Sequence, residues 1–578
     1  MSRDIFKRFE KYEPINKGWS SDKKYRVETS AGQRMLLRVS DTAEYERKKT
    51  EFEMMERVYN HGVLTPKPVE FGLCDDGKSC YSLSGWIDGE DAETALPLMP
   101  EAEQYALGLK AGELLRKMHT VPAPETAEPW RIRFGSKVRA RISEYNSKPD
   151  RHSDVGELLV YYLEMHRDVL VSRPQTFTHG DYNTENIILM PNGEVSVIDF
   201  NSHGTAYGDP WWDLDNMSWM PTMFPHFYSG QIRGYFGGEP PVDFWGAFAY
   251  YLAYDALGAL TNPYGINGVE DGTPIVNNIL NWTDNLQNPV PTWYLKDFHV
   301  QYIDGIPFKL KEPFDFSFLS KYGKVFKVYD DQDSGNICFG VADGENKYFV
   351  KFAGAPTERA NISTEEAISR MKSTVPIYQD LAHPALTRLI SSGEIVDAES
   401  LCGGFAMIFE WTDAECMGRQ YPQSREKFMQ MPIDTKLRVF DDILDFHAYI
   451  AAKGYVAIDF YDGSLMYDFN LNKTVICDVE FYAKAPYTNK MGRMWGSSRF
   501  MSPEEFELGA AIDEITNVYA MGAMAFSLFG DEERRDRRIE DWKLSRKLYD
   551  VAKRAVSDER SERQQSIRQF IEEWGAAK

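Results

Sequence analysis

Three polar side chains flank two short, largely apolar segments. Asp181 lies in a polar loop, Asn186 follows five residues later, and Asp199 comes directly after the second apolar segment, 195–198. Mg²⁺ prefers such carboxylate and amide oxygens and keeps waters and substrate phosphates in its remaining positions. A further carboxylate at the same place can take up a proton as a general base. The set therefore predicts a base beside a magnesium site.

A β-hairpin is the element that must hold these side chains. Residues 187–189 are apolar and 195–198 largely so, and Pro191, Asn192 and Gly193 between them are typical of a tight turn. Taken singly, each acid has a purely structural alternative, as the cap of a turn or the end of a strand. The ordered set on a hairpin favours the chemical interpretation.

The same residues resemble a known family. The sequence His-Gly-Asp at 179–181, then Asn186, then Asp199, is similar to the catalytic core of the aminoglycoside phosphotransferase family, which shares the protein-kinase fold. The resemblance implies that Asp181 is the catalytic base, which accepts the proton of a substrate hydroxyl. It also implies that Asn186 and Asp199 are metal ligands for Mg²⁺ and that ATP or GTP is the phosphate donor.

The N-terminal residues are expected to form the small lobe of such a fold. Segments 14–19, 24–29 and 34–39 read as three strands of a meander. Small polar residues at 18, 20 and 21 fall where the family covers the nucleotide phosphates, since they let the backbone approach an anion. Residues 81–89 look like a last strand that enters the hinge at which adenine binds.

Two charged residues of this lobe are candidates for nucleotide binding. Arg38 stands where the third strand of the fold usually offers a lysine to ATP, and a guanidinium can bind phosphate bidentately. Glu51, in the helical segment 44–59, stands where the fold places the acid that pairs with that cation. A solvated helix glutamate is an equally good interpretation of Glu51.

Two further residues have expected supporting roles. His119 ends the predicted helix 105–119 and is expected to be a packed structural histidine. Asp213, within a Gly-Asp-Pro-Trp-Trp-Asp sequence that also resembles the family, is expected to brace the backbone of the catalytic loop. The aromatic-rich helices that follow, to about residue 295, are expected to form core, and some of their rings to wall an acceptor pocket.

The second half repeats the outline of the first. Segments 324–329, 337–341 and 347–352 read as strands, and Lys351 near the end of the third matches the nucleotide-binding lysine of protein kinases. A surface lysine is the alternative. No glutamate is found near Thr374, where the small-lobe helix should carry the acid that pairs with this lysine.

The segment 454–480 resembles the active-site segment of serine/threonine protein kinases with several substitutions. Asp459 holds the position of the base and Asp478 that of the metal carboxylate. Ser464 replaces the usual asparagine ligand, and Asp462 is a candidate for the missing metal oxygen. Further on, the resemblance makes Arg563 a candidate partner for Glu504.

Composition narrows the class of protein. At 578 residues the chain is too long for one core, and its formal net charge of −23 disfavours nucleic acid and anionic membrane surfaces as partners. The six cysteines form no CxxC pair and read as reduced thiols of a cytoplasmic protein. The start lacks an apolar signal segment, and the long uncharged run 515–530 is shorter than a membrane span and reads as a buried helix.

These observations predict an α+β protein of two tandem protein-kinase-like folds, each with a β-rich small lobe and an α-rich large lobe. The expected domains are 1–300, similar to aminoglycoside phosphotransferases, and 313–578, similar to protein kinases with a partly divergent active site. The leading hypothesis is an ATP-dependent phosphotransferase acting on a hydroxyl of a small molecule. The alternatives are a serine/threonine protein kinase acting through the second domain, and a non-catalytic sensor or scaffold of the pseudokinase type.

Overall fold

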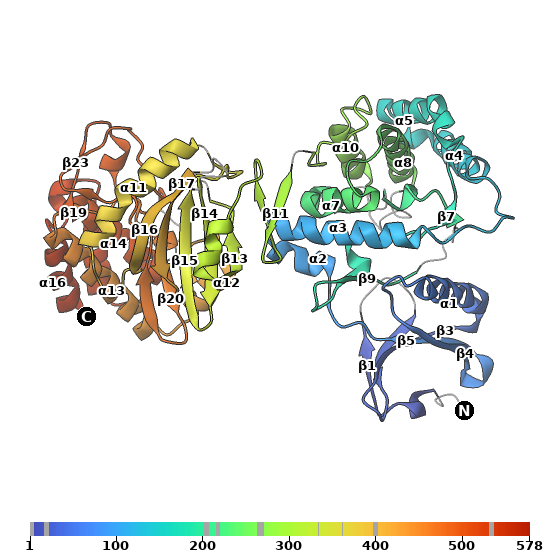
Figure 1. The fold of residues 1–578 in the computed structure, drawn as a ribbon, viewed down its shortest axis with the longest axis horizontal. Helices are drawn as coiled ribbons and strands as arrows, with labels where there is room; N and C mark the ends of the chain where they lie inside the picture. The colour runs from blue at the N-terminus through green and yellow to red at the C-terminus, as the bar shows by residue number, and fades with distance from the viewer. Residues whose placement is uncertain are drawn as a thin grey trace. The chain divides into compact units, whose positions relative to one another are not determined.

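The fold is that of a computed structural model, which describes residues 5–16, 22–200, 207–214, 220–262, 271–296, 298–332, 334–360, 362–396, 403–530 and 537–578 (Figure 1). The chain divides into two compact units, Met1–Val300 (unit 1) and Gln301–Lys578 (unit 2). The division falls between Val300 and Gln301.

The small sheet of unit 1 has five antiparallel strands in the order β1-β2-β3-β5-β4. Alternation sets its faces: Val27, Met35, Leu37 and Leu83 form an apolar cluster on one face with Ile5. The elements are β1 (Lys11–Ile15), β2 (Lys23–Glu28), β3 (Arg34–Asp41), α1 (Tyr45–Asn60), β4 (Pro68–Cys74) and β5 (Ser79–Gly85).

The rest of unit 1 is largely helical and carries the predicted hairpin. Gly108 and Gly112 of α3 lie directly against the backbone of α7, where a Cβ at either glycine would collide with a carbonyl oxygen. The strands are β6 (Glu90–Asp91), β7 (Thr176–Phe177), β8 (Ile187–Leu189), β9 (Val195–Val197) and β10 (Tyr207–Gly208). The helices are α2 (Ala92–Ala95), α3 (Glu101–Met118), α4 (Trp130–Asn146), α5 (Asp154–Met165), α6 (Met220–Met223), α7 (Pro225–Phe236), α8 (Val242–Thr261) and α10 (Thr273–Trp282).

Unit 2 opens with a second sheet of the same design. Its strand order β13-β14-β15-β17-β16 repeats the first-second-third-fifth-fourth order of unit 1, which confirms the predicted repetition of outline. The elements are β13 (Lys324–Tyr329), β14 (Asn336–Asp343), β15 (Asn346–Ala353), α11 (Thr364–Asp380), β16 (Leu389–Val396) and β17 (Gly403–Glu410). Ahead of them, β11 (His299–Ile303) and β12 (Ile306–Leu310) pair as a hairpin. The sequence analysis predicts no strand in this segment, most of which lies between the expected domains 1–300 and 313–578.

The large part of unit 2 surrounds the buried helix α14 (Glu514–Phe529), which confirms the reading of the uncharged run. Its other helices are α12 (Pro422–Met429), α13 (Ile433–Ala452), α15 (Arg546–Ala555) and α16 (Ile567–Ala577). Its strands are β18 (Glu415–Cys416), β19 (Tyr455–Val456), β20 (Leu465–Asp468), β21 (Lys473–Ile476), β22 (Ala483–Lys484), β23 (Tyr487–Thr488) and β24 (Ala511–Ile512).

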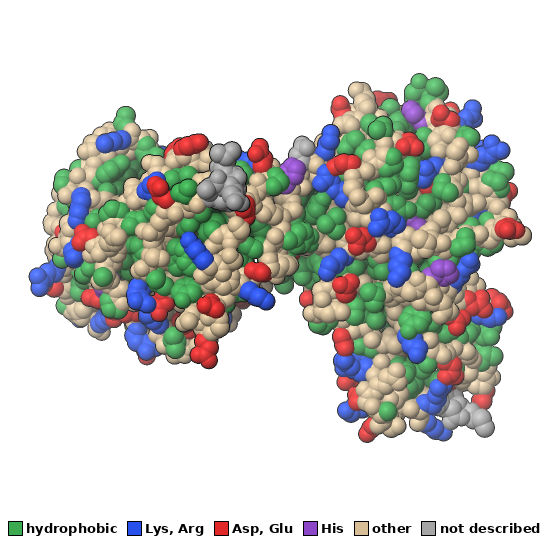
Figure 2. Space-filling view, viewed as in Figure 1, with side chains coloured by type: hydrophobic (Ala, Val, Ile, Leu, Met, Phe, Trp, Pro, Cys, Tyr) green, Lys and Arg blue, Asp and Glu red, His purple; other side chains and the backbone are tan. Residues whose placement is uncertain are grey.

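Two surface properties bear on partners. On the face shown in Figure 2, Lys and Arg side chains are interspersed with Asp and Glu. Among the residues that the structure describes, no helix is long and apolar enough to cross a membrane.

Candidate functional site

The structure brings Asp181, Asn186, Asp199 and Arg38 of unit 1 together. The hairpin β8-β9 does this, because Asn186 directly precedes its first strand and Asp199 follows its second. The Ile198 N–H donates to the Asn186 carbonyl at 2.9 Å, which ties the two ends of the hairpin to each other. Arg38 reaches this point from β3, in the small sheet.

Amide groups hold the carboxylate of Asp181 from two sides. Asn186 Nδ2 donates to Oδ2 at 2.9 Å, and Asn183 Nδ2 donates to Oδ1 at 2.6 Å. Burial, with the negative charge of Asp199 as a smaller contribution, raises the pKa of Asp181 above its ordinary value in spite of these donors. A raised pKa makes the carboxylate a better proton acceptor, as a general base requires.

Asp199 is held in the opposite electrostatic state. Burial alone would raise the pKa of Asp199, but Arg38 and then Lys24 outweigh that effect and lower it. Arg38 Nη1 lies 2.7 Å from Asp199 Oδ1, and 37% of the Asp199 side chain is exposed. The residue also takes a left-handed conformation, with φ of 64°. One carboxylate with a raised pKa beside one kept ionised is an arrangement that separates a base from a metal ligand.

The loop carrying Asp181 is fixed from below by Asp213, as the sequence predicts. The backbone N–H groups of His179 and Gly180 donate to the two oxygens of Asp213 at 2.6 and 2.8 Å. His119 Nε2 lies 3.0 Å from Asp213 Oδ2, and Tyr235 Oη lies 2.9 Å from His119 Nδ1. His119 is therefore the packed structural histidine that was expected.

His179 orders the loop from within. Its Nδ1 accepts the Asp181 N–H at 3.2 Å, so the ring proton belongs on Nε2, which lies 3.0 Å from the Ile198 carbonyl. One buried ring thus joins the backbone of Asp181 to the strand that leads to Asp199.

Glu51 lies in a network of cations on α1. Arg47 Nη1 and Lys48 Nζ each lie 3.1 Å from its carboxylate, and Lys48 also lies 2.7 Å from Asp22. A pairing of Glu51 with Arg38 stays a prediction. The predicted phosphate-covering residues Gly18, Ser20 and Ser21 lie outside the described part of the chain.

In unit 2, Lys351 has a partner that the sequence reading missed. Lys351 Nζ lies 2.8 Å from Glu480 Oε2 and 3.7 Å from Asp478 Oδ1. Burial alone would lower the pKa of Lys351, but the two carboxylates raise it well above its ordinary value, so the ammonium stays charged. Glu480 supplies the carboxylate expected on the helix near Thr374, and Lys351 is held in place.

The carboxylate of Asp459 has different surroundings from that of Asp181. The residue is left-handed, with φ of 62°, and a Cβ added to Gly496 would lie 3.4 Å from its Oδ1. Asp459 lines a cavity of about 10 Å³ together with Gly496, Met501 and Asn517. The side chain therefore lies against the segment 496–501.

Ser464 and Asp462, the two residues considered as metal ligands in unit 2, are both held by the protein. Ser464 is buried, and its hydroxyl donates to the Asp459 carbonyl at 3.3 Å. Asp462 is held by Arg425 Nη1 at 2.8 Å and by Arg499 Nη2 at 2.8 and 2.9 Å. Both oxygens of Asp462 thus bond guanidinium groups. These bonds explain the buried carboxylate without a metal ion.

Two further contacts support the large part of unit 2. Arg563 pairs bidentately with Glu504, at 2.7 and 3.0 Å, as predicted. Asn517 of α14 accepts the Ala457 N–H at 2.8 Å and donates to the Ala457 carbonyl at 2.7 Å. Asn517 thus braces the loop of unit 2 as Asp213 braces that of unit 1.

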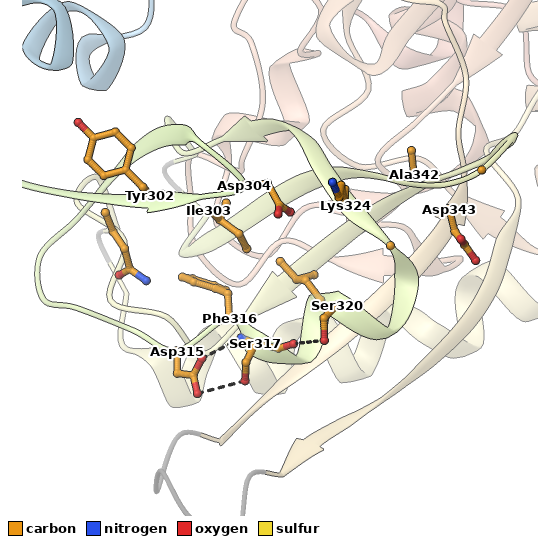
Figure 3. A pocket seen from close by; sticks show the side chains of 14 residues that line it. Tyr302, Ile303, Asp304, Asp315, Phe316, Ser317, Ser320, Lys324, Ala342 and Asp343 are labelled. Atoms are coloured by element: carbon orange, nitrogen blue, oxygen red, sulfur yellow. Dashed lines mark hydrogen bonds between the residues drawn. The ribbon is translucent and has the colours of Figure 1, made fainter.

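An open groove of about 640 Å³ lies away from these residues in unit 2, between the hairpin β11-β12, the 3-10 helix Ser317–Tyr322 and the ends of β13 and β14 (Figure 3). Two of its carboxylates bond the protein itself: Asp304 accepts the Val325 N–H at 2.7 Å, and Asp315 accepts from the N–H and hydroxyl of Ser317. We assign no chemistry to this groove.

Comparison with known proteins gives a match to one sequence family and a similarity to solved structures. Residues 11–245 match the sequence model of the phosphotransferase enzyme family, APH. The match takes in every candidate residue of unit 1 described above and none of unit 2. The chain is also similar to the crystal structure of a candidate aminoglycoside phosphotransferase from Ralstonia eutropha JMP134. That similarity has 17% identity and a TM-score of 0.36, and it covers 48% of this chain and 92% of the other. No curated protein matches.

The residues that sequence reasoning missed are those that act across long separations. Glu480 pairs with Lys351 over 129 positions, and Lys24 reaches Asp199 from another strand. A carboxylate at position 480, where protein kinases have glycine, was the available signal for Glu480. Lys24 offered no comparable signal, since one lysine on an exposed-looking strand is ordinary.

Proposed function

We propose that unit 1 is an ATP- or GTP-dependent phosphotransferase that transfers the γ-phosphate to a hydroxyl of a small molecule. The observation that carries the proposal is the convergence of Asp181, Asn186, Asp199 and Arg38 at the ends of one hairpin, in the part of the chain that matches the phosphotransferase family. Phosphoryl transfer depends mainly on positioning and electrostatic stabilisation, and these residues supply both.

Each residue has a distinct task in this proposal. Asp181 accepts the proton of the acceptor hydroxyl at a carboxylate oxygen that Asn183 and Asn186 orient. Asp213 keeps the loop in place through two backbone N–H groups, so that the base does not move during transfer. Arg38 exchanges its contact with Asp199 for the nucleotide phosphates.

The residues fit a magnesium ion. Asn186 turns Nδ2 toward Asp181, which directs its Oδ1 oxygen away from that carboxylate, and Asp199 offers an ionised, partly exposed carboxylate. Two protein oxygens plus phosphates and waters suit Mg²⁺, which rarely has an all-protein cage. The described residues contain no group of three or more His, Cys, Asp or Glu side chains that could hold a metal. When bound, the ion would neutralise charge on the phosphates.

The test is incubation of the purified full chain with γ-labelled ATP and Mg²⁺, with small-metabolite and protein fractions offered separately as acceptors. Label should enter a small molecule, and Asp181→Asn should abolish this while Asp459→Asn leaves it unchanged. Label in protein only, lost with Asp459→Asn, would replace this proposal with the protein-kinase alternative.

For unit 2 we propose nucleotide binding with little or no transfer. The specific observation in favour is that Asp459 lies against the segment 496–501 while Lys351 is already paired with Glu480. The free thiols among the described cysteines fit a reducing compartment, so we place the activity in the cytoplasm.

A further inference from the structure

Lys24 of β2 lies directly across from Arg38 of β3 in the small sheet of unit 1. Residues paired in this way on antiparallel strands point to the same side of the sheet, with Cβ atoms about 5 Å apart. Their neighbours Tyr25 and Leu37 belong to the apolar cluster on the other face. Lys24 and Arg38 therefore share the polar face, from which Arg38 reaches Asp199.

A direct cross-strand pair of two cations is unfavourable by itself. Burial, and then the charge of Arg38, lowers the pKa of Lys24, while Asp199 and Asp22 act in the opposite sense. Asp22 already bonds Lys48 and the Ser40 hydroxyl, both at 2.7 Å. Glu51 also lies 3.1 Å from Lys48, so Lys48 has two carboxylates of its own, whereas Lys24 and Arg38 both act on the charge of Asp199.

Unit 2 supplies an internal comparison. The residue across from Lys351 on the equivalent pair of strands is Cys338, a buried neutral thiol. There, one cation is balanced by Glu480 and Asp478. The second cation is thus a property of unit 1 and not of the strand arrangement that the two units share.

We propose that Lys24 is a second phosphate-binding cation of unit 1, and that Lys24 and Arg38 together hold neighbouring phosphates of the nucleoside triphosphate. This inference deepens the proposed function and rests on it. The Cβ atoms of such a pair are about 5 Å apart, so two long cationic side chains on this face can contact adjacent phosphoryl groups of one ligand. The phosphates take the place of Asp199 as counter-charge for both side chains, which leaves that carboxylate to its metal role.

The chain offers a matched control in Lys23. It is exposed and lies on the same strand, and because adjacent residues of a strand point to opposite faces, its side chain cannot share the position of Lys24. Lys24→Met and Lys23→Met remove the same charge from the same strand. Lys24→Arg keeps the charge at the proposed position.

The experiment is titration calorimetry of MgATP against the full chain, with Lys351→Met throughout to silence unit 2. Lys24→Met should weaken binding about tenfold or more, as expected for a lost charge-assisted contact. Lys23→Met and Lys24→Arg should stay within about threefold of the parent. Thermal unfolding of the Lys24→Met and Lys23→Met variants at the same temperature shows that the loss is not one of folding.

Equal affinities of Lys24→Met and Lys23→Met would overturn the inference and leave the proposed function standing. A parent that binds no MgATP would reject the proposed function, and the inference with it. The two failures are therefore distinguishable in one set of titrations.

Discussion

The loops 179–186 of unit 1 and 457–464 of unit 2 share one architecture. In both, the residue five positions after the aspartate donates a side-chain hydrogen bond to that aspartate's carbonyl, from Asn186 at 3.0 Å and from Ser464 at 3.3 Å. In both, the carbonyl of that residue accepts an N–H from the strand ahead of the second aspartate. The second aspartates, Asp199 and Asp478, have φ of 64° and 62°.

The loops differ at the residue before the first aspartate. Gly180 takes a left-handed turn with φ of 79° ahead of Asp181. The equivalent residue in unit 2 is Ile458, and a β-branched residue is strongly disfavoured in that conformation. The left-handed turn falls on Asp459 itself, with φ of 62°, and its carboxylate lies beside Gly496. A matching residue type at a matching position therefore does not guarantee a matching site.

The small sheets teach the same lesson through charge. Unit 1 places Lys24 and Arg38 near Asp199, whereas unit 2 places Lys351 between Glu480 and Asp478. The two arrangements differ in net charge, because two cations lie near one carboxylate in unit 1 and one cation lies between two carboxylates in unit 2.

The largest expected effect comes from replacing Asp181, and it is compared with the effect of replacing Asp459. Asp181→Asn keeps the size of the side chain but removes the proton acceptor, so transfer should fall about 10²- to 10⁴-fold. Asp459→Asn should change transfer little, because its carboxylate lies against 496–501. Initial rates of the two variants, with MgATP binding as the control, measure the difference.

Equal losses in both variants would remove the distinction between the units. A gain of transfer on Ile458→Gly, lost again with Asp459→Asn, would support the role given to the left-handed turn and show that the rest of unit 2 is competent.

The next effect concerns the stability of each unit. Unit 2 depends on the buried pair Arg563–Glu504, and unit 1 on Arg173–Asp209, at 2.5 and 2.7 Å, which Tyr251 also bonds. Removing Arg173 takes away the guanidinium that pairs with buried Asp209, which costs about 3–5 kcal/mol. Removing Arg563 costs less, because Arg560 still lies 2.5 Å from Glu504. Arg563→Met should lower one unfolding transition in calorimetry, and Arg173→Met the other.

A single transition that falls equally with either variant would show instead that the two units unfold as one. Exposed Arg568→Met, on α16, is the control and should shift unfolding little.

Much of this arrangement is readable from the sequence, because it depends on local patterns. The hairpin 187–198, the strand 324–329 and the buried helix 515–530 follow from apolar runs between turn residues, and the structure has them within a residue or so. The first strand was misplaced: β1 ends at Ile15, where a strand 14–19 was predicted, and 17–21 lies outside the described residues.

What the sequence could not show depends on register and distant pairing. That Lys24 lies across from Arg38 is known only from the register of β2 and β3. That Lys351 pairs with Glu480 is known only from the folded structure. The lack of a glutamate near Thr374 therefore does not leave Lys351 without a carboxylate, because its partner Glu480 comes from the turn after Asp478. The steric limit on φ at Ile458 likewise matters only because the surrounding fold requires a left-handed residue in this turn, which in unit 2 is Asp459.

A smaller effect should follow from neutralising one acid of unit 2. Glu480→Gln removes a negative charge next to Lys351 while keeping an oxygen that can accept from its ammonium. Repulsion of phosphate falls, so ADP without Mg²⁺ should bind unit 2 about three- to tenfold more tightly. Titration on an Arg38→Met background isolates this site, and weaker binding would show that Glu480 positions Lys351 for the nucleotide.

The smallest effect is a shift in the pH dependence of unit 1. Asp181 must be ionised to accept a proton, and burial already raises its pKa, so activity is lost on the acid side as pH falls through that raised value. Asn183 Nδ2 donates to the ionised carboxylate at 2.6 Å and therefore lowers this pKa.

Asn183→Ser retains an acceptor for the Glu185 N–H but loses the amide donor. The acid limb of kcat/KM should then move to higher pH by about half to one unit, with the rate at high pH nearly unchanged. A shift of the acid limb to lower pH, or no shift, would mean that the Asn183 contact does not lower the pKa of Asp181. This test applies to unit 1 alone, because Tyr461 holds the position equivalent to Asn183 in unit 2.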